Sequence, residues 1–158
     1  MMKIAGFTIL GEPKGKGRPK FKKTGPYSQP YTPEQTVIYE NLIAMTYQQQ
    51  KQIRFADEDY IEIVIYAYYE IPKSKSKKVK AAMQTGQIRP IKKPDADNIV
   101  KIVCDSLNGV AYRDDVQIMD ATIHRFYDER PRIEVFLRSC QRPLYQKPQG
   151  AALPFEWR

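Results

Sequence analysis

Residues 92–117 read KKPDADNIVKIVCDSLNGVAYRDDVQ, and they combine an amphipathic helical pattern with two pairs of carboxylates. At about 100° per residue, the part from 97 to 107 divides into an apolar side and a polar side. The apolar side, which we expect to face a core, consists of Ile99, Ile102, Val103 and Leu107. The polar side carries Asp97, Asn98, Lys101 and Asp105. The segment therefore predicts a half-buried helix that ends at Asn108-Gly109 and presents charged groups at its surface.

The chain before this helix predicts two strands and two further helices. Residues 2–10 and 60–71 are rich in β-branched and aromatic side chains, which favour strands. The sequence Thr-Pro-Glu-Gln at 32–35 starts a helix that we expect to run to about residue 51. Its inward-facing residues are predicted to be Val37, Ile38, Leu42 and either Ile43 or Met45. A short basic helix is expected at 74–84, where Gly86 stops it.

The remaining segments complete a single domain. Residues 11–30 are expected to lack regular structure, because they contain four glycines and four prolines. Residues 115–129 and 132–138 read as strands, and we expect them to pair as an antiparallel hairpin. Residues 1–140 then form an α+β domain, with a mixed or antiparallel sheet and about three helices packed mainly on one face. Residues 141–158 are rich in Pro, Gln and Gly and are predicted to be a C-terminal tail.

The charge balance indicates an anionic partner. The 158 residues include 26 Lys and Arg against 18 Asp and Glu, a net charge of +8 that points to nucleic acid, an anionic membrane or acidic ligands. His124 is the only histidine, so zinc sites and catalysis by a serine–histidine or cysteine–histidine pair are nearly excluded. We expect a cytoplasmic protein for three reasons. The two cysteines are expected to be free, the N-terminal segment does not resemble a secretory leader, and no apolar run reaches about 18 residues.

The carboxylates suggest a divalent cation held against a polyanion. Asp95 and Asp97 stand at the head of the helix and Asp115 at the start of the next strand, so the three can supply oxygen ligands to Mg²⁺ or Mn²⁺. Such an ion polarises a phosphate and activates water as a nucleophile. Lys101, one turn below Asp97, would add a positive charge beside the scissile phosphate.

The same residues also have an ordinary structural explanation. Lys101 forms i, i+4 pairs with Asp97 and Asp105, and such surface ion pairs stabilise a helix by about 0.2–0.5 kcal/mol each. Asp95 can serve only as a helix cap, and the acidic pair at 114–115 only as a solvated turn. The residues alone support a metal site and a charged surface about equally.

Three basic clusters favour contact with nucleic acid over a solvated surface. The first lies in a glycine-rich loop whose backbone can approach phosphates closely, the second on the short basic helix, and the third directly before the carboxylates. The residues predicted to bind DNA are Lys14, Lys16, Arg18, Lys20, Lys22, Lys23, Lys75, Lys77, Lys78, Arg89, Lys92 and Lys93. Phe21, Tyr27 and Tyr31 flank the first cluster, where they either stack on bases or order the loop.

Four motifs resemble the RusA family of Holliday-junction resolvases. They are P-K-G-K-G-R-P-K-F at 13–21, K-P-D-A-D-N-I-V-K at 93–101, D-S-L-N-G at 105–109 and D-D-V-Q at 114–117. The resemblance implies a homodimeric crossover junction endodeoxyribonuclease that depends on Mg²⁺, for which Mn²⁺ can substitute. It further implies paired symmetric nicks in four-way DNA junctions during recombination and repair.

The resemblance also implies a role for each residue of the acidic segment. Asp95, Asp97 and Asp115 correspond to metal-binding and catalytic carboxylates and Lys101 to a catalytic lysine, while a contribution from Asp114 stays open. A homodimer with two identical sites matches the twofold symmetry of a junction. Two other functions remain as alternatives, a non-catalytic DNA-binding module and a metal-dependent phosphohydrolase acting on nucleotides or RNA.

Overall fold

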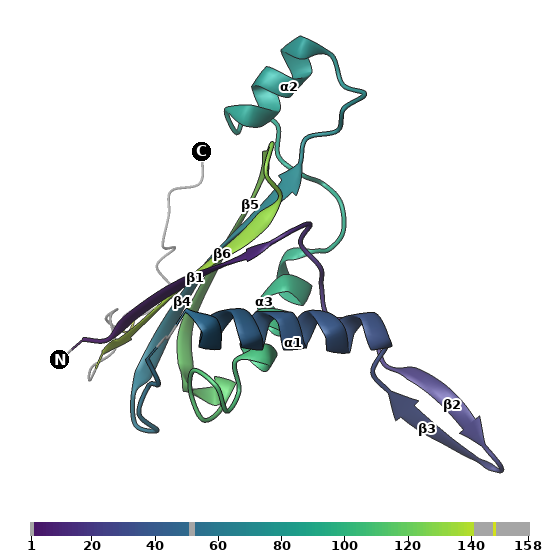
Figure 1. The fold of residues 1–158 in the computed structure, drawn as a ribbon, viewed down its shortest axis with the longest axis vertical. Coiled ribbons are helices and arrows are strands. Elements are labelled where there is room, and N and C mark those ends of the chain that lie inside the picture. The colour runs from purple at the N-terminus through teal and green to yellow at the C-terminus, as the bar shows by residue number, and fades with distance from the viewer. Residues whose placement is uncertain (1, 51–52, 141–146, 148–158) are drawn as a thin grey trace.

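The computed structural model describes residues 2–50, 53–140 and 147, so the predicted tail at 141–158 lies outside the described residues except for Lys147. The helices are α1 (Glu34–Gln49), α2 (Lys77–Gln84) and α3 (Ala96–Ser106), and a 3₁₀ turn spans Asp115–Gln117. The strands are β1 (Ile4–Leu10), β2 (Lys20–Thr24), β3 (Tyr27–Tyr31), β4 (Tyr60–Glu70), β5 (Ile118–Asp128) and β6 (Arg132–Cys140). Figure 1 shows α1 and α3 beside the sheet, with α2 and the β2–β3 hairpin projecting from opposite ends.

The main sheet has the strand order β1-β6-β4-β5 and is mixed, because β4 pairs antiparallel with β6 and parallel with β5. The predicted hairpin between the last two strands is therefore wrong, since β4 lies between them. The short connection crosses the end of β4, where the Ile71 amide donates to the Asp128 carbonyl at 3.1 Å. Residues 61–69 of β4 are all buried or half-buried, which suits a central position in the sheet.

One face of the sheet encloses the core together with α1 and α3. Phe7, Ile63 and Val135 point into it from three neighbouring strands and are at most 3% exposed. The predicted buried side of α3 is confirmed, since all four of its apolar residues are 0% exposed. The predicted fold class, an α+β domain with a mixed sheet and three helices, is confirmed within the described residues. None of these helices has the length and apolar character needed to span a bilayer.

Helix α1 is oriented differently from the prediction. Its buried residues are Thr36, Tyr39, Ile43 and Tyr47, so only Ile43 was correctly predicted to face inward. The other predicted core residues lie on the solvent side, with exposures of 40% for Val37, 60% for Ile38, 44% for Leu42 and 54% for Met45. Aromatic rings explain the difference, because the Tyr47 ring packs edge-on against Phe7 with centroids 5.2 Å apart. Its hydroxyl donates to the Ile53 carbonyl at 2.5 Å, which satisfies the polar end of a buried residue.

The segment predicted to be irregular contains the β2–β3 hairpin, which is a second correction. Thr24 pairs with Tyr27, so Gly25 and Pro26 form a two-residue turn. Gly25 has φ of +65°, a conformation that glycine adopts without steric cost. Pro30 is tolerated because each strand of a two-stranded ribbon has a free edge. The glycines and prolines thus mark a turn and an edge in this segment, and they do not prevent pairing.

Candidate functional site

Helix α3 begins at the predicted carboxylates. Asp95 is its N-cap residue in an extended conformation, and Asp97 lies in the first turn. The Asp95 side chain does not cap the helix, but its Oδ1 accepts a hydrogen bond from Asn98 Nδ2 at 2.5 Å. The local fold therefore leaves both carboxylates near the helix N-terminus, where the helix dipole favours negative charge.

Asp97 and Lys101 on α3 line one cavity together with Asp115, and the volume of this cavity is about 570 Å³. We call it the acidic cavity. Its remaining walls come from α3 and β5 and are mostly apolar, being formed by Ala96, Val100, Cys104, Ile118, Ala121 and Ile123. Burial raises the pKa of the Cys104 thiol to about 12, so the thiol is neutral and part of the wall. Three of the four predicted catalytic side chains thus meet at one place.

Asp115 lies on the 3₁₀ turn and not at the start of β5, which begins three residues later at Ile118. Asp114 caps this turn by accepting from the Val116 amide at 3.0 Å. Gln117 is buried and donates through Nε2 to the Ala56 carbonyl at 2.8 Å, while its Oε1 accepts from the Arg113 amide at 3.1 Å. The D-D-V-Q motif is therefore a capped turn, and its glutamine fixes the position of Asp115.

The Asp115 carboxyl group lies among like charges. Partial burial raises its pKa above 3.8, and hydrogen bonding to Asp114 and the negative charge of Asp105 raise it further. The pKa of Asp114 is lowered, because the Val116 amide and Asp115 both hydrogen-bond to its carboxylate. Carboxylates gathered in this way raise the free energy of the ionised state, and a bound cation lowers it.

Asp95 faces a second hollow of about 610 Å³, which we call the basic groove. Its walls are the glycine-rich loop, the beginning of α1 and the approach to α3. The charged residues that line it are Lys14, Lys16, Arg18, Lys93 and Asp95. The cations thus outnumber the single carboxylate, and a phosphate backbone is the complementary ligand. Asp95 lines the groove and Asp97 the acidic cavity, so both hollows reach the head of α3.

The carboxylates fit a hard cation that keeps part of its hydration shell. Mg²⁺ prefers oxygen ligands and commonly binds one or two carboxylates together with water and substrate phosphate. Asp97 and Asp115 form such a pair around the acidic cavity, and Asp95 lines the neighbouring groove. Across residues 2–50 and 53–140, no group of three or more His, Cys, Asp or Glu side chains lies close enough to hold an ion. A partly hydrated ion therefore fits this donor set better than an ion enclosed by protein ligands alone.

The glycine-rich loop is fixed to α1 and α3 by Lys16. Its Nζ lies 2.6 Å from Glu40 Oε1 and 2.9 Å from Asp105 Oδ2, and its amide donates to the Asn98 carbonyl at 3.2 Å. Burial lowers the pKa of Lys16, but the two carboxylates outweigh this effect and hold it above 10.5. The prediction that Lys16 binds DNA stays a prediction, and in this structure its charge is neutralised within the protein.

Two glycines let this loop pack closely. A Cβ atom at Gly15 would lie 2.9 Å from the Cβ atoms of Asn98 and Pro94. A Cβ atom at Gly17 would lie 2.4 Å from Thr36 Oγ1, which accepts a hydrogen bond from the Gly17 amide. Both distances are shorter than carbon and oxygen atoms tolerate, so these positions need glycine to keep the basic groove in place.

Arg125 and Tyr69 position the segment that leads into Asp95, and the sequence did not single them out. The Tyr69 hydroxyl donates to the Pro94 carbonyl at 2.5 Å. Arg125 Nη1 donates to the carbonyls of Pro94 and Lys92 at 3.0 and 2.9 Å. The available signal was an arginine at a position of β5 that faces the core side of the sheet, because a half-buried cation needs hydrogen-bond acceptors.

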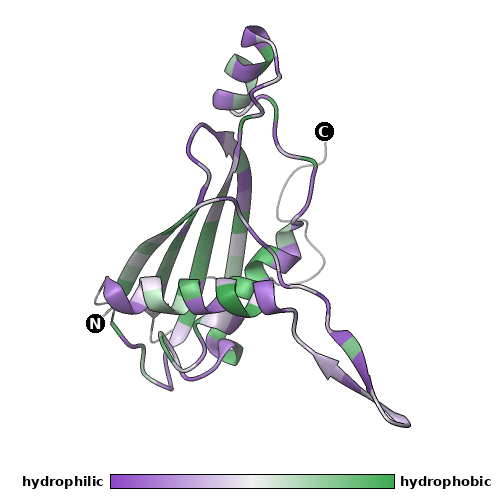
Figure 2. Cartoon of the chain, turned by 45° about the vertical axis from the view of Figure 1, so that its right-hand side comes forward, coloured by the Kyte–Doolittle hydropathy of each residue, from purple (hydrophilic) through white to green (hydrophobic). Residues whose placement is uncertain are grey.

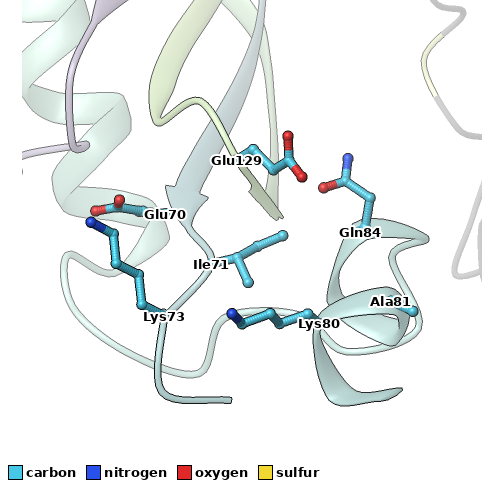
Figure 3. A pocket seen from close by; sticks show the side chains of 7 residues that line it. All are labelled: Glu70, Ile71, Lys73, Lys80, Ala81, Gln84 and Glu129. Carbon is cyan, nitrogen blue, oxygen red and sulfur yellow. The ribbon is translucent and has the colours of Figure 1, made fainter. Parts of the chain in front are cut away.

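Other predicted DNA-binding residues lie outside the acidic cavity and the basic groove. Arg89 lies over the Phe126 ring, 4.2 Å from its centroid, and Lys92 lies 5.5 Å from the centroid of Tyr69. Lys77 and Lys78 form the exposed start of α2, and Lys75 precedes it. A hollow of about 390 Å³ between α2 and the end of β4 carries both signs of charge, with Glu70 and Glu129 beside Lys73 and Lys80 (Figure 3). It lacks the separation of charge that distinguishes the acidic cavity from the basic groove.

Comparison with known proteins identifies the family to which a chain with this fold belongs. Residues 11–138 match the family described as Endodeoxyribonuclease RusA, and the chain belongs to this family of endonucleases that act on DNA junctions. A similar protein is YqaN of Bacillus subtilis (strain 168), which is described as uncharacterized. The two are 34% identical over 134 residues, which cover 84% of this chain and 94% of YqaN.

Proposed function

We propose that this protein is a homodimeric endodeoxyribonuclease that uses Mg²⁺ or Mn²⁺ to resolve four-way DNA junctions by paired symmetric nicks in recombination and repair. The observation that carries the proposal is the acidic cavity, because carboxylates gain nothing beside a polyanion unless a cation lies between them. The cavity occurs in a chain of net charge +8 and adjoins a groove lined by cations.

Each residue of the site has a distinct role in this proposal. Asp97 and Asp115 hold the ion at the acidic cavity, and Asp95 contributes from the edge of the basic groove. When bound, the ion supplies Lewis-acid polarisation of the scissile phosphate and a nucleophilic water near neutral pH. Lys101 lines the same cavity and stabilises negative charge that develops on the phosphate during cleavage.

The basic groove orients the substrate strand. Lys14, Arg18 and Lys93 neutralise backbone phosphates, and the other predicted cations except Lys16 extend this contact over the surrounding surface. Contacts of this kind position DNA without reading its sequence, so selectivity follows backbone shape and deformability. Binding should weaken steeply with salt, because each neutralised phosphate releases a counterion.

The exposed stripe on α1 supports the homodimer. Val37, Ile38, Leu42 and Met45 lie opposite the buried side of this helix. The helix contains no Lys or Arg, although the chain as a whole is strongly basic. An apolar and cation-free face suits a protein partner better than DNA, and a second copy can present the same stripe across a twofold axis.

The proposal is tested with the Asp97→Asn variant on a synthetic four-way junction in Mg²⁺. Asp97→Asn should bind the junction and lose cleavage, because it removes a ligand of the ion and leaves the basic groove intact. The matched control is Asp120→Asn on β5, whose backbone partner Glu62 places it on the sheet face opposite the acidic cavity. Equal cleavage rates for Asp97→Asn and the unmodified protein would show that the ion is held elsewhere.

A further inference from the structure

The β2–β3 hairpin differs from the rest of the described chain because all residues of both strands are exposed. Its strands pair only with each other, and the ribbon extends away from the sheet beyond the first turn of α1 (Figures 1 and 2). Phe21 and Tyr27 are 70% and 75% exposed, and Tyr31 is 47% exposed. Packing in a core thus does not explain why this ribbon carries three aromatic residues.

The strand register places cations and rings on one face of the ribbon. Opposed residues of an antiparallel pair project from the same face, and the faces alternate along each strand. One face therefore carries the pairs Lys20–Tyr31, Lys22–Gln29 and Thr24–Tyr27. The other carries Phe21 opposite Pro30 and Lys23 opposite Ser28. Along the first face, the two tyrosines are about 13 Å apart and the two lysines about 7 Å.

The charge of this region identifies the partner. Residues 13–31 contain Lys14, Lys16, Arg18, Lys20, Lys22 and Lys23 and no Asp or Glu. Such a segment is complementary to a polyanion, and it continues directly from the glycine-rich loop that lines the basic groove. A DNA strand that lies in the basic groove beside Asp95 would therefore extend toward the ribbon. Exposed rings beside these cations add an affinity for the faces of unstacked bases, which continuous duplex DNA does not offer.

We propose that the β2–β3 hairpin is a base-stacking arm, in which Tyr27 and Tyr31 stack on bases that are unstacked at the branch point while Lys20 and Lys22 contact neighbouring phosphates. This inference rests on the proposed function, because it takes branched DNA as the substrate. The tyrosines then determine selectivity for branched over continuous DNA, whereas the lysines increase the affinity for both.

The experiment uses the full chain in metal-free buffer, where DNA is bound without cleavage. The probes are a four-way junction with 2-aminopurine beside the branch point and a duplex of the same length with 2-aminopurine at its centre. The test variant is Tyr27→Leu/Tyr31→Leu, and Tyr27→Phe/Tyr31→Phe keeps the rings. Tyr60→Leu on the main sheet is the matched control, since Tyr60 is also exposed, at 41%.

We expect the leucine variant to bind the junction at least about fivefold more weakly per ring lost, with an unchanged affinity for the duplex. Its junction complex should also lose the quenching of 2-aminopurine that stacking produces, and the phenylalanine variant should restore both. Equal losses on junction and duplex would overturn the inference, because they would indicate insertion of the ribbon into a groove of continuous DNA. Unchanged junction affinity and quenching in the leucine variant would also overturn it.

Nicking in Mg²⁺, measured on the same junction, separates the two proposals. A protein that shows tyrosine-dependent quenching but never nicks the junction retains the arm and refutes the nuclease. A protein that nicks the junction but shows no dependence on the rings retains the nuclease and refutes the arm. Thermal unfolding of each variant should match the unmodified protein, because the substituted side chains are exposed.

Discussion

Lys16→Met removes the cation that joins the glycine-rich loop to both helices of the site. In the folded protein, its Nζ makes two short contacts with Glu40 and Asp105, at 2.6 and 2.9 Å. The three side chains are only 24%, 23% and 28% exposed, so water replaces the lost contacts poorly. The variant also leaves Asp105 without its counter-ion beside Asp115, whose pKa the negative charge of Asp105 already raises.

The loss of folding free energy expected for Lys16→Met lies between the values for exposed and buried ion pairs. Hydrogen bonds to charged groups contribute about 1.5–3 kcal/mol when buried, and exposed pairs about 0–1 kcal/mol. For this partly exposed bridge, we expect the free energy of unfolding to fall by about 2 kcal/mol. In a chain of 158 residues this lowers Tm by about 4–8 °C.

Urea and thermal unfolding of Lys16→Met measure this cost, with Lys20→Met on the exposed hairpin as the control. The difference from the unmodified protein should persist at neutral pH. Because the pKa of Lys16 is raised in the folded state, its contribution is complete below 10.5 and is lost as pH rises through the higher folded value. Adding Asp105→Asn should recover part of the loss. A loss for Lys16→Met no larger than that for Lys20→Met would refute the bridge as a structural element.

Three further predictions concern the rest of the molecule. Asp128→Asn should destabilise the protein by about 1 kcal/mol at pH 7, because it removes the ion pair with Arg132. Arg132 holds the folded pKa of Asp128 below 3.8, so the difference in stability should disappear as pH falls through that pKa. Unfolding at several pH values measures this, and a difference that stays constant with pH would contradict it. Leu42→Arg on the α1 stripe should convert a dimer into a monomer in sedimentation experiments while leaving Tm nearly unchanged, and an unaltered sedimentation coefficient would place the interface elsewhere. Lys22→Gln/Lys23→Gln should reduce the slope of log affinity against log salt by about 1–2, whereas Lys16→Met should leave it unchanged, and equal slopes in all three proteins would contradict the assigned roles.

The sequence predicted the buried side of α3 accurately, because Ile99, Ile102, Val103 and Leu107 follow the helical period. Helix α1 was misoriented for the opposite reason. Its strongest apolar residues, among them Ile38 and Leu42, are exposed, whereas Tyr39 and Tyr47 are buried. A pattern based on hydrophobicity ranks tyrosine below leucine and does not include the area that a ring buries or the bond its hydroxyl makes. Nor does it show that the apolar residues Ile38 and Leu42 lie on the exposed side of the helix.

Pairing and turn geometry also lie beyond local patterns. The adjacent strands β5 and β6 look like a hairpin in the sequence, but the more completely buried β4 separates them. The β2–β3 hairpin depends on a positive φ at Gly25. From composition alone, this glycine predicts an interruption of regular structure. Within the candidate site, the spacing of Asp95 and Asp97 predicted their proximity, but not that one lines the groove and the other the cavity. Those positions depend on distant residues such as Arg125 and Gln117.

The central claim is that Asp97 and Asp115 jointly hold a divalent cation beside Lys101. Titration calorimetry of the purified protein with Mn²⁺, in the presence of a junction whose phosphates resist cleavage, measures this most directly. The account predicts saturable uptake that Asp97→Asn and Asp115→Asn each weaken by at least about tenfold, and that Asp120→Asn leaves unchanged. Uptake of equal affinity in all four proteins, or no uptake in any of them, would contradict it.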